Sequence, residues 1–309
     1  MKPSNRNSSC FLFLLIALFI VSFFSCSNDA SDSADSSASV RSITVAVVMS
    51  GGKNSERMAR FLQISDWYAE NFRQAQKNSA FKNDFELKLE WYDEDSMTTE
   101  ELTTLADELV ARKDVFAIIG PSYSINLEIF AEKCFESKKP LIAPTASSEN
   151  LVRSYAVNVA QYGRKKPFLW TLTQTDDAQS AILISQVLAN GGKKISLLSS
   201  ADTYGRTFFE WMPFIAAQAG VELVQNVRYK SENTGQTYEA GTPAEQFGVA
   251  LEKVFSQETD YIICALSSTK DIETVLRTRS EMLKGKTTRL LFSDTAFSPE
   301  LLKFGELAE

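Results

Sequence analysis

Two hydroxyl-rich loops carry the residue types best suited to binding chemistry in this sequence. Residues 120–124 read Gly-Pro-Ser-Tyr-Ser after an apolar run that ends at Ile119, and they open a helical stretch over residues 125–137. Residues 144–148 read Pro-Thr-Ala-Ser-Ser and follow the next apolar run, residues 141–143. Free backbone N–H groups, the positive end of a helix dipole and nearby hydroxyls favour a carboxylate or other anion without a positively charged side chain.

Catalytic chemistry finds little support. The chain contains no histidine, which removes the commonest general base and the commonest zinc ligand. It has neither a Gly-x-Ser-x-Gly elbow nor a phosphate-binding glycine loop. The densest carboxylate group, Asp93, Glu94 and Asp95, precedes a capped helix, and such an acidic run is typical of a solvated turn. We therefore expect no enzymatic activity, no cofactor and no metal site.

The elements that position the two loops follow from the hydrophobic pattern. From residue 43, short apolar β-type runs alternate with amphipathic helical stretches, which is typical of βαβ units and a parallel sheet. Helical periodicity is clear over residues 58–72 and 102–109, and Thr98 with Glu101 forms a capping box. Strands are predicted at residues 43–49, 87–92, 115–119, 141–143, 168–172, 195–198, 221–229, 261–265 and 289–292.

A break near residues 160–175 divides this series in two. Residues 162–167 read Tyr-Gly-Arg-Lys-Lys-Pro and interrupt the pattern before a second α/β series begins. We predict an α/β fold of two Rossmann-like lobes with parallel sheets, an N-terminal lobe over residues 43–165 and a C-terminal lobe over residues 166–309. Ligands lie beyond the carboxyl ends of the strands in doubly wound sheets, so we expect a ligand cleft between the lobes.

The first residues have the features of an export signal. Lys2 and Arg6 precede an uncharged apolar run over residues 11–24. That run is too short to span a bilayer comfortably, so it indicates a secretory signal over residues 1–25 and not a transmembrane helix. The protein is therefore expected in the cell envelope or periplasm.

A cysteine follows directly after this signal. Ser25-Cys26 resembles the processing site of bacterial lipoproteins, where the cysteine becomes the lipidated N-terminus, although Phe23 and Phe24 differ from the usual pattern. The resemblance implies a membrane anchor at Cys26, and the alternative is an ordinary signal peptide with an incidental cysteine. Residues 26–42 are mostly Ser, Asp, Ala and Asn, a composition that predicts a disordered tether.

The overall charge argues against nucleic acid as a partner. The full chain carries a net charge of −7, and loss of Lys2 and Arg6 with the signal would make it −9. No cluster of Lys or Arg with interleaved aromatic residues occurs. Outside the signal and Cys26, the cysteines Cys134 and Cys264 fall in different predicted lobes, so we expect buried thiols and no disulfide.

Four short segments follow one another along the chain: Ile-Ile-Gly-Pro at 118–121, Pro-Leu-Ile-Ala-Pro at 140–144, Asp-Asp-Ala-Gln at 176–179 and Tyr-Gly-Arg at 204–206. In this order and spacing they resemble the type I periplasmic binding proteins, specifically the branched-chain amino acid (leucine/isoleucine/valine) binding family of ABC transporters. The resemblance runs from about residue 43 to 302. It implies a solute-binding lipoprotein for amino-acid transport, which captures an amino acid or similar small carboxylate or amide and delivers it to an ABC permease in the inner membrane.

The resemblance also implies site residues. In that family, a serine of the first loop and the residues after the proline of the second loop hold the α-carboxylate of the ligand. A tyrosine packs on the ligand, and an acidic residue after a late strand pairs with its ammonium group. The matching positions here are Ser124, Thr145, Ala146, Ser147, Tyr204 and Asp294.

Each of these positions also has a plainer structural interpretation. Ser124 and Ser147 could be helix N-caps, worth about 1 kcal/mol each. Thr145 and Ser148 could be caps or solvent-exposed residues. Two remaining alternatives concern the second lobe: its tyrosine could pack only on its own lobe, and its acidic residue could cap residues 296–302.

Two departures limit what the resemblance implies. The loop after Ala265 reads Leu-Ser-Ser-Thr and lacks the aromatic residue found near there in branched-chain binders, so the side-chain pocket should be smaller or more polar. Family members also continue for several elements beyond the segment that ends at Glu309 here. Either the sequence is truncated or the second lobe is reduced.

An alternative function comes from the same resemblance. The fold also serves as the sensing part of receptors and in outer-membrane lipoproteins that activate peptidoglycan synthases. An envelope lipoprotein that acts through a protein partner, as a sensor or a synthase activator, is therefore the competing hypothesis. Convergence of Ser124, Ser147, Tyr204 and Asp294 on a sealed pocket would favour solute capture over this alternative.

Overall fold

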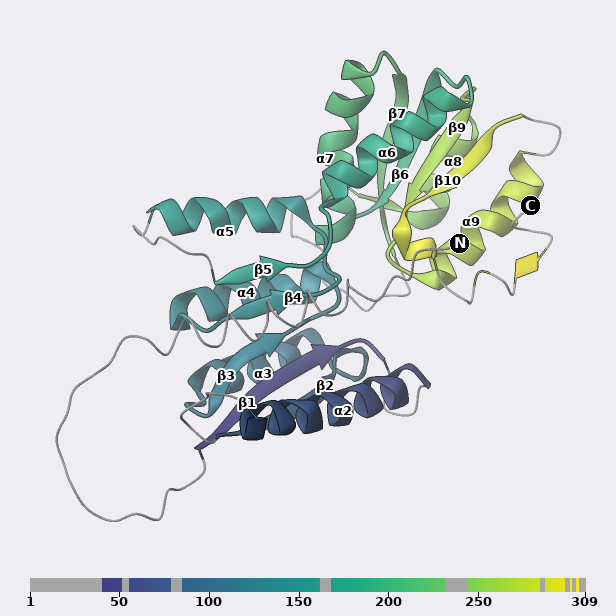
Figure 1. Ribbon diagram of the computed structural model, residues 1–309. Coiled ribbons are helices and arrows are strands. Elements are labelled where there is room, and N and C mark those ends of the chain that lie inside the picture. The colour runs from purple at the N-terminus through teal and green to yellow at the C-terminus, as the bar shows by residue number, and fades with distance from the viewer. Residues whose placement is uncertain are drawn as a thin grey trace, which may run out of the picture. The chain divides into compact units, whose positions relative to one another are not determined.

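The computed structural model describes residues 41–51, 56–78, 85–161, 168–231, 244–283, 287–297, 301 and 304–305 (Figure 1). The predicted signal over residues 1–25, the lipidation position Cys26 and the predicted tether up to residue 40 lie outside these residues. So does the part of the predicted hinge at 162–167. No helix within the described part of the chain is long and apolar enough to cross a membrane.

The first sheet carries the two hydroxyl-rich loops. Its strands are β1 (Arg41–Met49), β2 (Phe85–Asp93), β3 (Val115–Ile119), β4 (Leu141–Ala143) and β5 (Leu169–Thr171). They lie in the order β2-β1-β3-β4-β5, and every neighbouring pair is parallel. The first strand begins two residues earlier than predicted, so residues 41 and 42 belong to β1 and not to the tether.

The second sheet has its own parallel set. Its strands are β6 (Lys194–Ser200), β7 (Glu222–Lys230), β8 (Glu245–Gln246), β9 (Tyr261–Ala265) and β10 (Arg289–Phe292). They lie in the order β10-β9-β6-β7-β8, again with parallel neighbours. The predicted α/β fold class with two parallel-sheet lobes is confirmed.

Helices connect successive strands. The described helices are α2 (Glu56–Asn78), α3 (Thr99–Ala111), α4 (Ser124–Ser137), α5 (Glu149–Gln161), α6 (Asp176–Ala189), α7 (Thr203–Gln218), α8 (Phe247–Phe255) and α9 (Thr269–Met282), with the short 3₁₀ helices η1 (Glu94–Ser96) and η2 (Asp294–Ala296). Figure 1 shows α2 in front of the first sheet and α3 behind it. The capping box predicted before α3 is confirmed: Thr98 accepts from the Glu101 N–H at 3.2 Å, and the Glu101 carboxylate accepts from the Thr98 N–H at 2.7 Å.

The predicted lobe boundary at 165/166 falls before β5, whereas β5 pairs with β4 in the first sheet. The first sheet therefore extends to Thr171. The chain enters the second α/β series only at α6. A break in the hydrophobic pattern marks a loop, but sheet membership depends on which strand supplies the hydrogen-bond partners, and the pattern contains no information about that pairing.

Each sheet is buried by apolar helix faces. Ile118 and Leu141, at the centre of the first sheet, pack in one cluster with Leu102 of α3 and Phe130 of α4. The corresponding clusters of the second lobe contain residues of α6, α7, α8 and α9. Strands covered on their faces read as continuous apolar runs, which explains why the sequence pattern located them.

The two cysteines lie in different cores. Cys134 packs in the first-lobe cluster and Cys264 in β9, and both thiols are free and buried. Burial raises the pKa of the Cys134 thiol to about 12 and also raises that of Cys264. The prediction of two buried, unpaired thiols is confirmed.

Strand order determines which loops meet. In the first sheet the direction of winding reverses between β1 and β3, and in the second sheet it reverses between β6 and β9. Connections on the two sides of such a switch point diverge to opposite faces, which leaves a crevice at the carboxyl edge. The loop after β3, residues 120–123, and the loop after β6, residues 201–202, both border these crevices together with the first turns of α4 and α7.

Two glycines allow close backbone approaches beside the switch points. Gly120 has φ +94°, and a Cβ there would lie 1.7 Å from the carbonyl oxygen of Val48 in β1. A Cβ on Gly205 would lie 2.2 Å from the carbonyl oxygen of Ser200 in β6. Because both obstacles are backbone atoms, a side chain could be accommodated only by moving the strand.

We expect Gly120→Ala to destabilise the folded protein by about 3 kcal/mol or more, because the added methyl group collides with β1 and strains the backbone. Gly248→Ala in α8 is the matched control, since no atom lies within 4 Å of its added Cβ. Alanine there should be neutral or stabilising by up to about 1 kcal/mol. Urea unfolding followed by circular dichroism measures both, and equal stabilities of the two variants would contradict the close approach.

Candidate functional site

Hydrogen bonds join the loops at the carboxyl edge of the first sheet. After β1, the Ser50 N–H donates to the Ser122 hydroxyl at 2.9 Å, and the Ser50 hydroxyl donates to Asp95 at 2.8 Å. The Tyr123 hydroxyl lies 3.0 Å from the same Ser50 oxygen. Burial is the main cause that raises the pKa of Tyr123 to about 12, so this phenol stays protonated. The loops after β1, β2 and β3 therefore form one connected network.

The acidic run after β2 differs from its predicted solvated state. Asp93 is 6% exposed and Glu94 is 2% exposed, whereas Asp95 is exposed. Glu94 accepts hydrogen bonds from the Ser122 N–H at 2.7 Å and from the Asn126 side-chain amide at 2.8 Å. Burial raises its pKa above the usual range, against the lowering effect of these bonds. The prediction failed because the donors come from residues about 30 positions later in the chain.

The site positions predicted in the first lobe occupy different environments. Ser124 is 4% exposed and is the first residue of α4, and the N-cap position belongs to Tyr123, which makes no side-chain capping bond. No hydrogen bond joins the Ser124 hydroxyl to another described residue. Thr145 is exposed and donates to the Ser122 carbonyl oxygen at 3.0 Å, while Ala146 is buried in the core. Within the described residues, no hydrogen bond of the protein would have to break for the Ser124 hydroxyl to bind a ligand.

The serine pair after β4 lies at the crossover to α6 and α7. The Ser147 carbonyl oxygen accepts from the Asp176 N–H at 3.0 Å, and the Ser147 hydroxyl interacts with the Asp176 carboxyl group. Ser148 lies 3.2 Å from both the carbonyl oxygen of Thr203 and the hydroxyl of Thr207 in α7. Ser148 therefore has a structural role, which leaves Ser147 as the residue beside the acidic group.

Two predicted residues of the second lobe meet directly. The Tyr204 hydroxyl donates to Asp294 Oδ1 at 2.8 Å, and the Tyr204 ring contacts Phe208 edge-on at 5.2 Å between centroids. Burial and the neighbouring Asp294 charge raise the pKa of Tyr204. Asp294 is exposed and opens η2, whose N-cap is Ser293. Tyr204 and Asp294 together present a hydroxyl and a carboxylate beyond β6 and β10.

Asp176 is a candidate site residue that the sequence did not reveal. It opens α6, is 1% exposed, and its Oδ2 atom has no hydrogen-bond partner among the described residues. Burial raises its pKa to about 8, with further contributions from the charges of Asp294, Asp177 and Asp202, opposed by the Ser147 interaction. An acid in the first turn of a helix is common, so its type and position gave no signal of this burial.

The second-lobe cluster is therefore Asp176, Tyr204 and Asp294, with Ser147 beside it. The described residues supply no cationic partner for these carboxylates by ion pairing, and they contain no group of three or more His, Cys, Asp or Glu placed to hold a metal ion. The arrangement suits a ligand with a positively charged hydrogen-bond donor.

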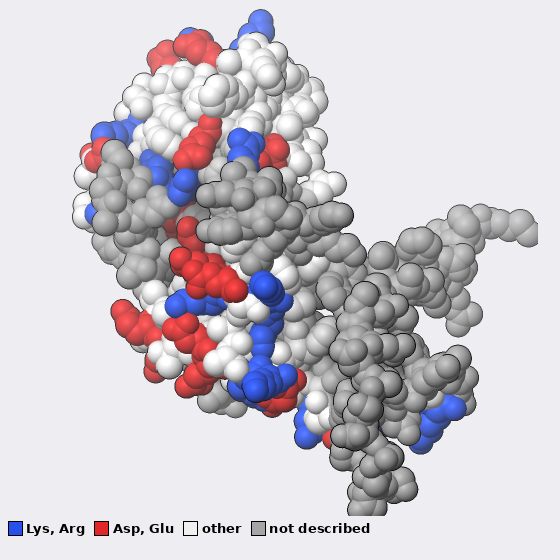
Figure 2. Space-filling view, turned by 90° about the vertical axis from the view of Figure 1, so that its left-hand side faces the viewer, with Lys and Arg blue, Asp and Glu red and all other residues white. Residues whose placement is uncertain are grey.

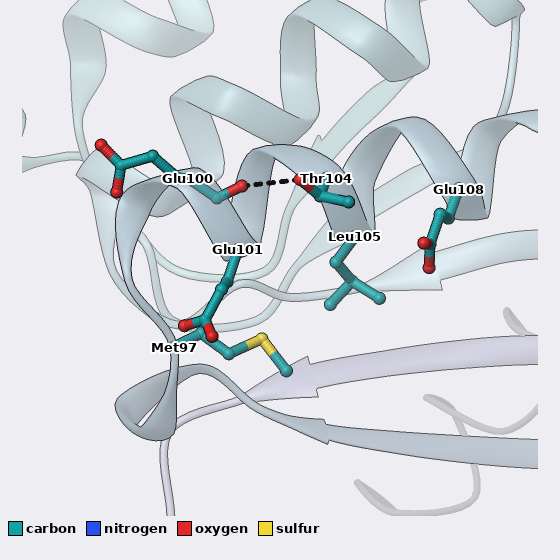
Figure 3. Close-up of a pocket in the computed structure, with 6 residues that line it drawn as sticks. All are labelled: Met97, Glu100, Glu101, Thr104, Leu105 and Glu108. Atoms are coloured by element: carbon teal, nitrogen blue, oxygen red, sulfur yellow. Dashed lines mark hydrogen bonds between the residues drawn. The ribbon is translucent and has the colours of Figure 1, made fainter.

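A cavity of about 380 Å³ lies elsewhere in the first lobe, along α3 (Figure 3). It is lined by Met97, Glu100, Glu101, Thr104, Leu105 and Glu108. Figure 3 shows Met97, Glu101 and Leu105 projecting to the same side of the helix, while the Thr104 hydroxyl donates to the Glu100 carbonyl oxygen. None of these residues belongs to the switch-point loops, so this cavity is separate from the candidate site.

The charged side chains on the face in Figure 2 are mixed in sign. Among the described residues, acidic and basic side chains are interspersed there, and neither sign forms a broad field. These residues therefore form no continuous positive surface of the kind that phosphate backbones require.

Comparison with known proteins shows which family and which solved structures this chain is similar to. A family model described as periplasmic binding protein matches residues 55–280. The leucine binding protein LivK from Thermotoga maritima is 20% identical with a TM-score of 0.62, covering 86% of this chain and 68% of that one. A solute binding protein of an ABC transporter from Rhodopseudomonas palustris HaA2, in complex with p-hydroxybenzoic acid, is 18% identical with a TM-score of 0.65, covering 86% and 66%.

A further solved structure is an ABC transporter substrate-binding protein from Desulfitobacterium hafniense, 14% identical with a TM-score of 0.59, covering 82% of this chain and 66% of that one. The chain thus spans about two thirds of the length of these proteins. At such identities the likeness shows the fold. A search among curated proteins found no match.

We expect the stability of the wild-type protein to depend on Asp176 between about pH 4 and pH 8. Its folded-state pKa of about 8 exceeds its ordinary value of 3.8, so the folded protein retains a proton that the unfolded chain has lost. This contribution is complete below pH 3.8 and falls by up to about 1.4 kcal/mol per pH unit as the pH rises toward 8.

Urea unfolding at pH 5, 6, 7 and 8 tests this dependence. Asp176→Asn should remove that part of the slope, while Glu222→Gln, at an exposed side chain of β7, should keep it. Identical pH profiles for the wild type and Asp176→Asn would show that the carboxyl is ionised and compensated in the folded state.

Proposed function

Because the chain belongs to the periplasmic binding protein family, we propose that it is the extracytoplasmic solute-binding component of an ABC transporter, and that it captures an amino acid or a similar small solute with an ammonium group. The observation that carries the proposal is the buried Asp176 carboxyl beside Tyr204 and Asp294. Its Oδ2 has no hydrogen-bond partner among the described residues, and burial raises its pKa to about 8 because a lone buried carboxylate is costly. A ligand ammonium would supply the missing donors.

The carboxylate end of the solute is assigned to the first lobe. The Ser124 hydroxyl has no hydrogen-bond partner among the described residues and lies in the first turn of α4, where backbone N–H groups and the helix dipole favour an anion. Thr145, Ala146 and Ser147 follow the adjacent strand β4, and the Thr145–Ser122 bond ties this second loop to the first. Both loops leave the carboxyl edge of one sheet.

Capture proceeds in two states. The solute binds first to the loops of the first lobe. The lobes then rotate about the end of the predicted 160–175 segment, the crossover between β5 and α6, because residues 169–171 stay paired with β4; Tyr204 and Asp294 cover the solute. No covalent step is needed, because binding energy alone selects the closed form that the permease recognises. Export through the signal at residues 1–25 and lipidation at Cys26 would hold the protein at the membrane that contains the permease.

The acidic cluster favours an amino acid over a simple aromatic acid as the ligand. The similar protein from Rhodopseudomonas palustris was solved with p-hydroxybenzoic acid, which has a carboxylate but no ammonium group. Such a ligand offers the cluster only a neutral phenol hydroxyl as a donor, whereas an ammonium group would form a charge-assisted bond with the ionised form of Asp176 or Asp294. Discrimination between an amino acid and its des-amino analogue is therefore the property that the cluster predicts.

We expect an amino acid to raise the midpoint of thermal unfolding of the mature protein, and the des-amino carboxylic acid with the same side chain to have no such effect. A ligand at about 100 times its Kd stabilises by about 2.7 kcal/mol, which corresponds to a shift of several degrees. Asp294→Asn should weaken binding by about 30-fold or more, because it leaves the ammonium without its charged partner. Calorimetry measures the affinities.

The Glu222→Gln variant, whose carboxylate lies away from the cluster on β7, serves as the affinity control and should bind as the wild type does. Equal binding of the amino acid and the des-amino acid would contradict the role of the acidic cluster. A cooperative transition that none of the twenty amino acids, simple amides or small carboxylates moves would contradict solute capture and favour action through a protein partner.

We expect Tyr204→Phe to weaken amino-acid binding by about fivefold. The substitution keeps the ring that contacts Phe208 but removes the hydroxyl that orients Asp294, a hydrogen bond worth about 1 kcal/mol. Calorimetry gives the affinity and thermal unfolding without ligand reports the stability. A loss of stability with unchanged affinity would mean that Tyr204 serves only its own lobe.

A further inference from the structure

One buried carboxylate holds the loop that opens α4. Glu94 follows β2 directly, is 2% exposed and uses both oxygens. Oε1 accepts from the backbone N–H of Ser122 at 2.7 Å, and Oε2 accepts from the Asn126 side-chain amide at 2.8 Å. The first donor lies in the loop after β3 and the second in the first turn of α4. Glu94 therefore fixes the loop and the helix start relative to each other.

Ser122 is hydrogen-bonded to the other loops as well. Besides its N–H bond to Glu94, its hydroxyl accepts from the Ser50 N–H at 2.9 Å and its carbonyl oxygen accepts from Thr145 at 3.0 Å. The loops after β1, β2 and β4 are thus connected through one residue. Ser124 lies two positions later, and its hydroxyl makes no hydrogen bond to another described residue, so the placement of this hydroxyl depends on the backbone that Ser122 anchors.

The chemistry of the contact requires a carboxylate. Both partners of Glu94 are N–H donors, and a carboxylate can accept from both, whereas the amide of glutamine offers one acceptor and one donor. No lysine or arginine of the described part of the chain forms an ion pair with Glu94, and the ionisable groups that face it are Asp95 and Tyr123. Burying a charge without a counter-ion costs free energy. In return, the two hydrogen bonds of Glu94 fix the orientation of the loop.

We infer that Glu94 is a positioning residue for solute binding, which orients residues 120–126 so that the Ser124 hydroxyl and the free N–H groups of α4 face the carboxylate of the solute. The inference deepens the proposed function and rests on it for the identity of the ligand. The orientation of the loop itself does not depend on that identity, so it can be measured without any solute.

The first experiment is amide hydrogen–deuterium exchange on the full mature protein without solute. In Glu94→Gln, the amide NH₂ of glutamine faces one of the two donors, so residues 120–127 should exchange at least tenfold faster than in the wild type. Glu86→Gln, at an exposed position of the same strand β2, is the matched control and should leave exchange unchanged. Wild-type protection of residues 120–127 in Glu94→Gln would overturn the inference.

The second experiment measures affinity for the amino acid that gives the largest thermal shift. Glu94→Gln should bind at least tenfold more weakly. As the pH falls, wild-type affinity should decline by two contributions: Asp176 gains a proton below about pH 8, and Glu94 gains a proton and can no longer accept both bonds. The variant should keep the contribution of Asp176 and lack that of Glu94, so its decline should be smaller. A decline of equal size in wild type and variant would overturn the inference.

The outcomes separate the two proposals. Faster exchange in Glu94→Gln combined with a wild type that binds no solute would retain Glu94 as the residue that holds the loop and would overturn the proposed function. If Glu94→Gln does not fold, Asn126→Ala removes only the helix-side donor, and it should raise exchange over the same residues. Unchanged exchange in Asn126→Ala would then count against the inference.

Discussion

Parallel pairing is the constraint from which the candidate site follows. Since β1 pairs in parallel with both β2 and β3, and β3 with β4, all four strands deliver their following loops to one edge of the sheet. Residues that are tens of positions apart, such as Ser50, Glu94 and Ser122, are thereby within hydrogen-bonding distance. The close approach of Gly120 to Val48 holds two of these strands at the required spacing.

Two buried carboxyl groups, Glu94 and Asp176, differ in how many hydrogen-bond donors the protein gives them. Glu94 is fully engaged by two protein donors, so it acts as a rigid support. Asp176 has one oxygen without a partner among the described residues and several acidic neighbours, and burial raises the pKa of both carboxyls. Glu94 thus has protein donors for both oxygens, whereas Asp176 leaves one oxygen for a ligand to contact.

The sequence predicted the parallel α/β architecture because strands buried on their faces read as apolar runs and helices show their amphipathic period. Tyr204 and Asp294 were predicted only through a resemblance, and their direct contact depends on two loops ninety residues apart. Glu94 and Asp176 were missed because their types are ordinary for a turn and a helix start. Their burial is created by elements that are distant in the sequence. The assignment of β5 was wrong because its pairing with β4 also depends on a distant segment.

The separation of the two cysteines has a consequence for redox behaviour. Cys134 and Cys264 belong to different cores, and burial keeps both as unreactive thiols, since the thiolate is the nucleophile in disulfide exchange. While the lobes stay folded, burial shields these two thiols from each other and from an external oxidant. Unfolding would expose both to oxidative cross-linking.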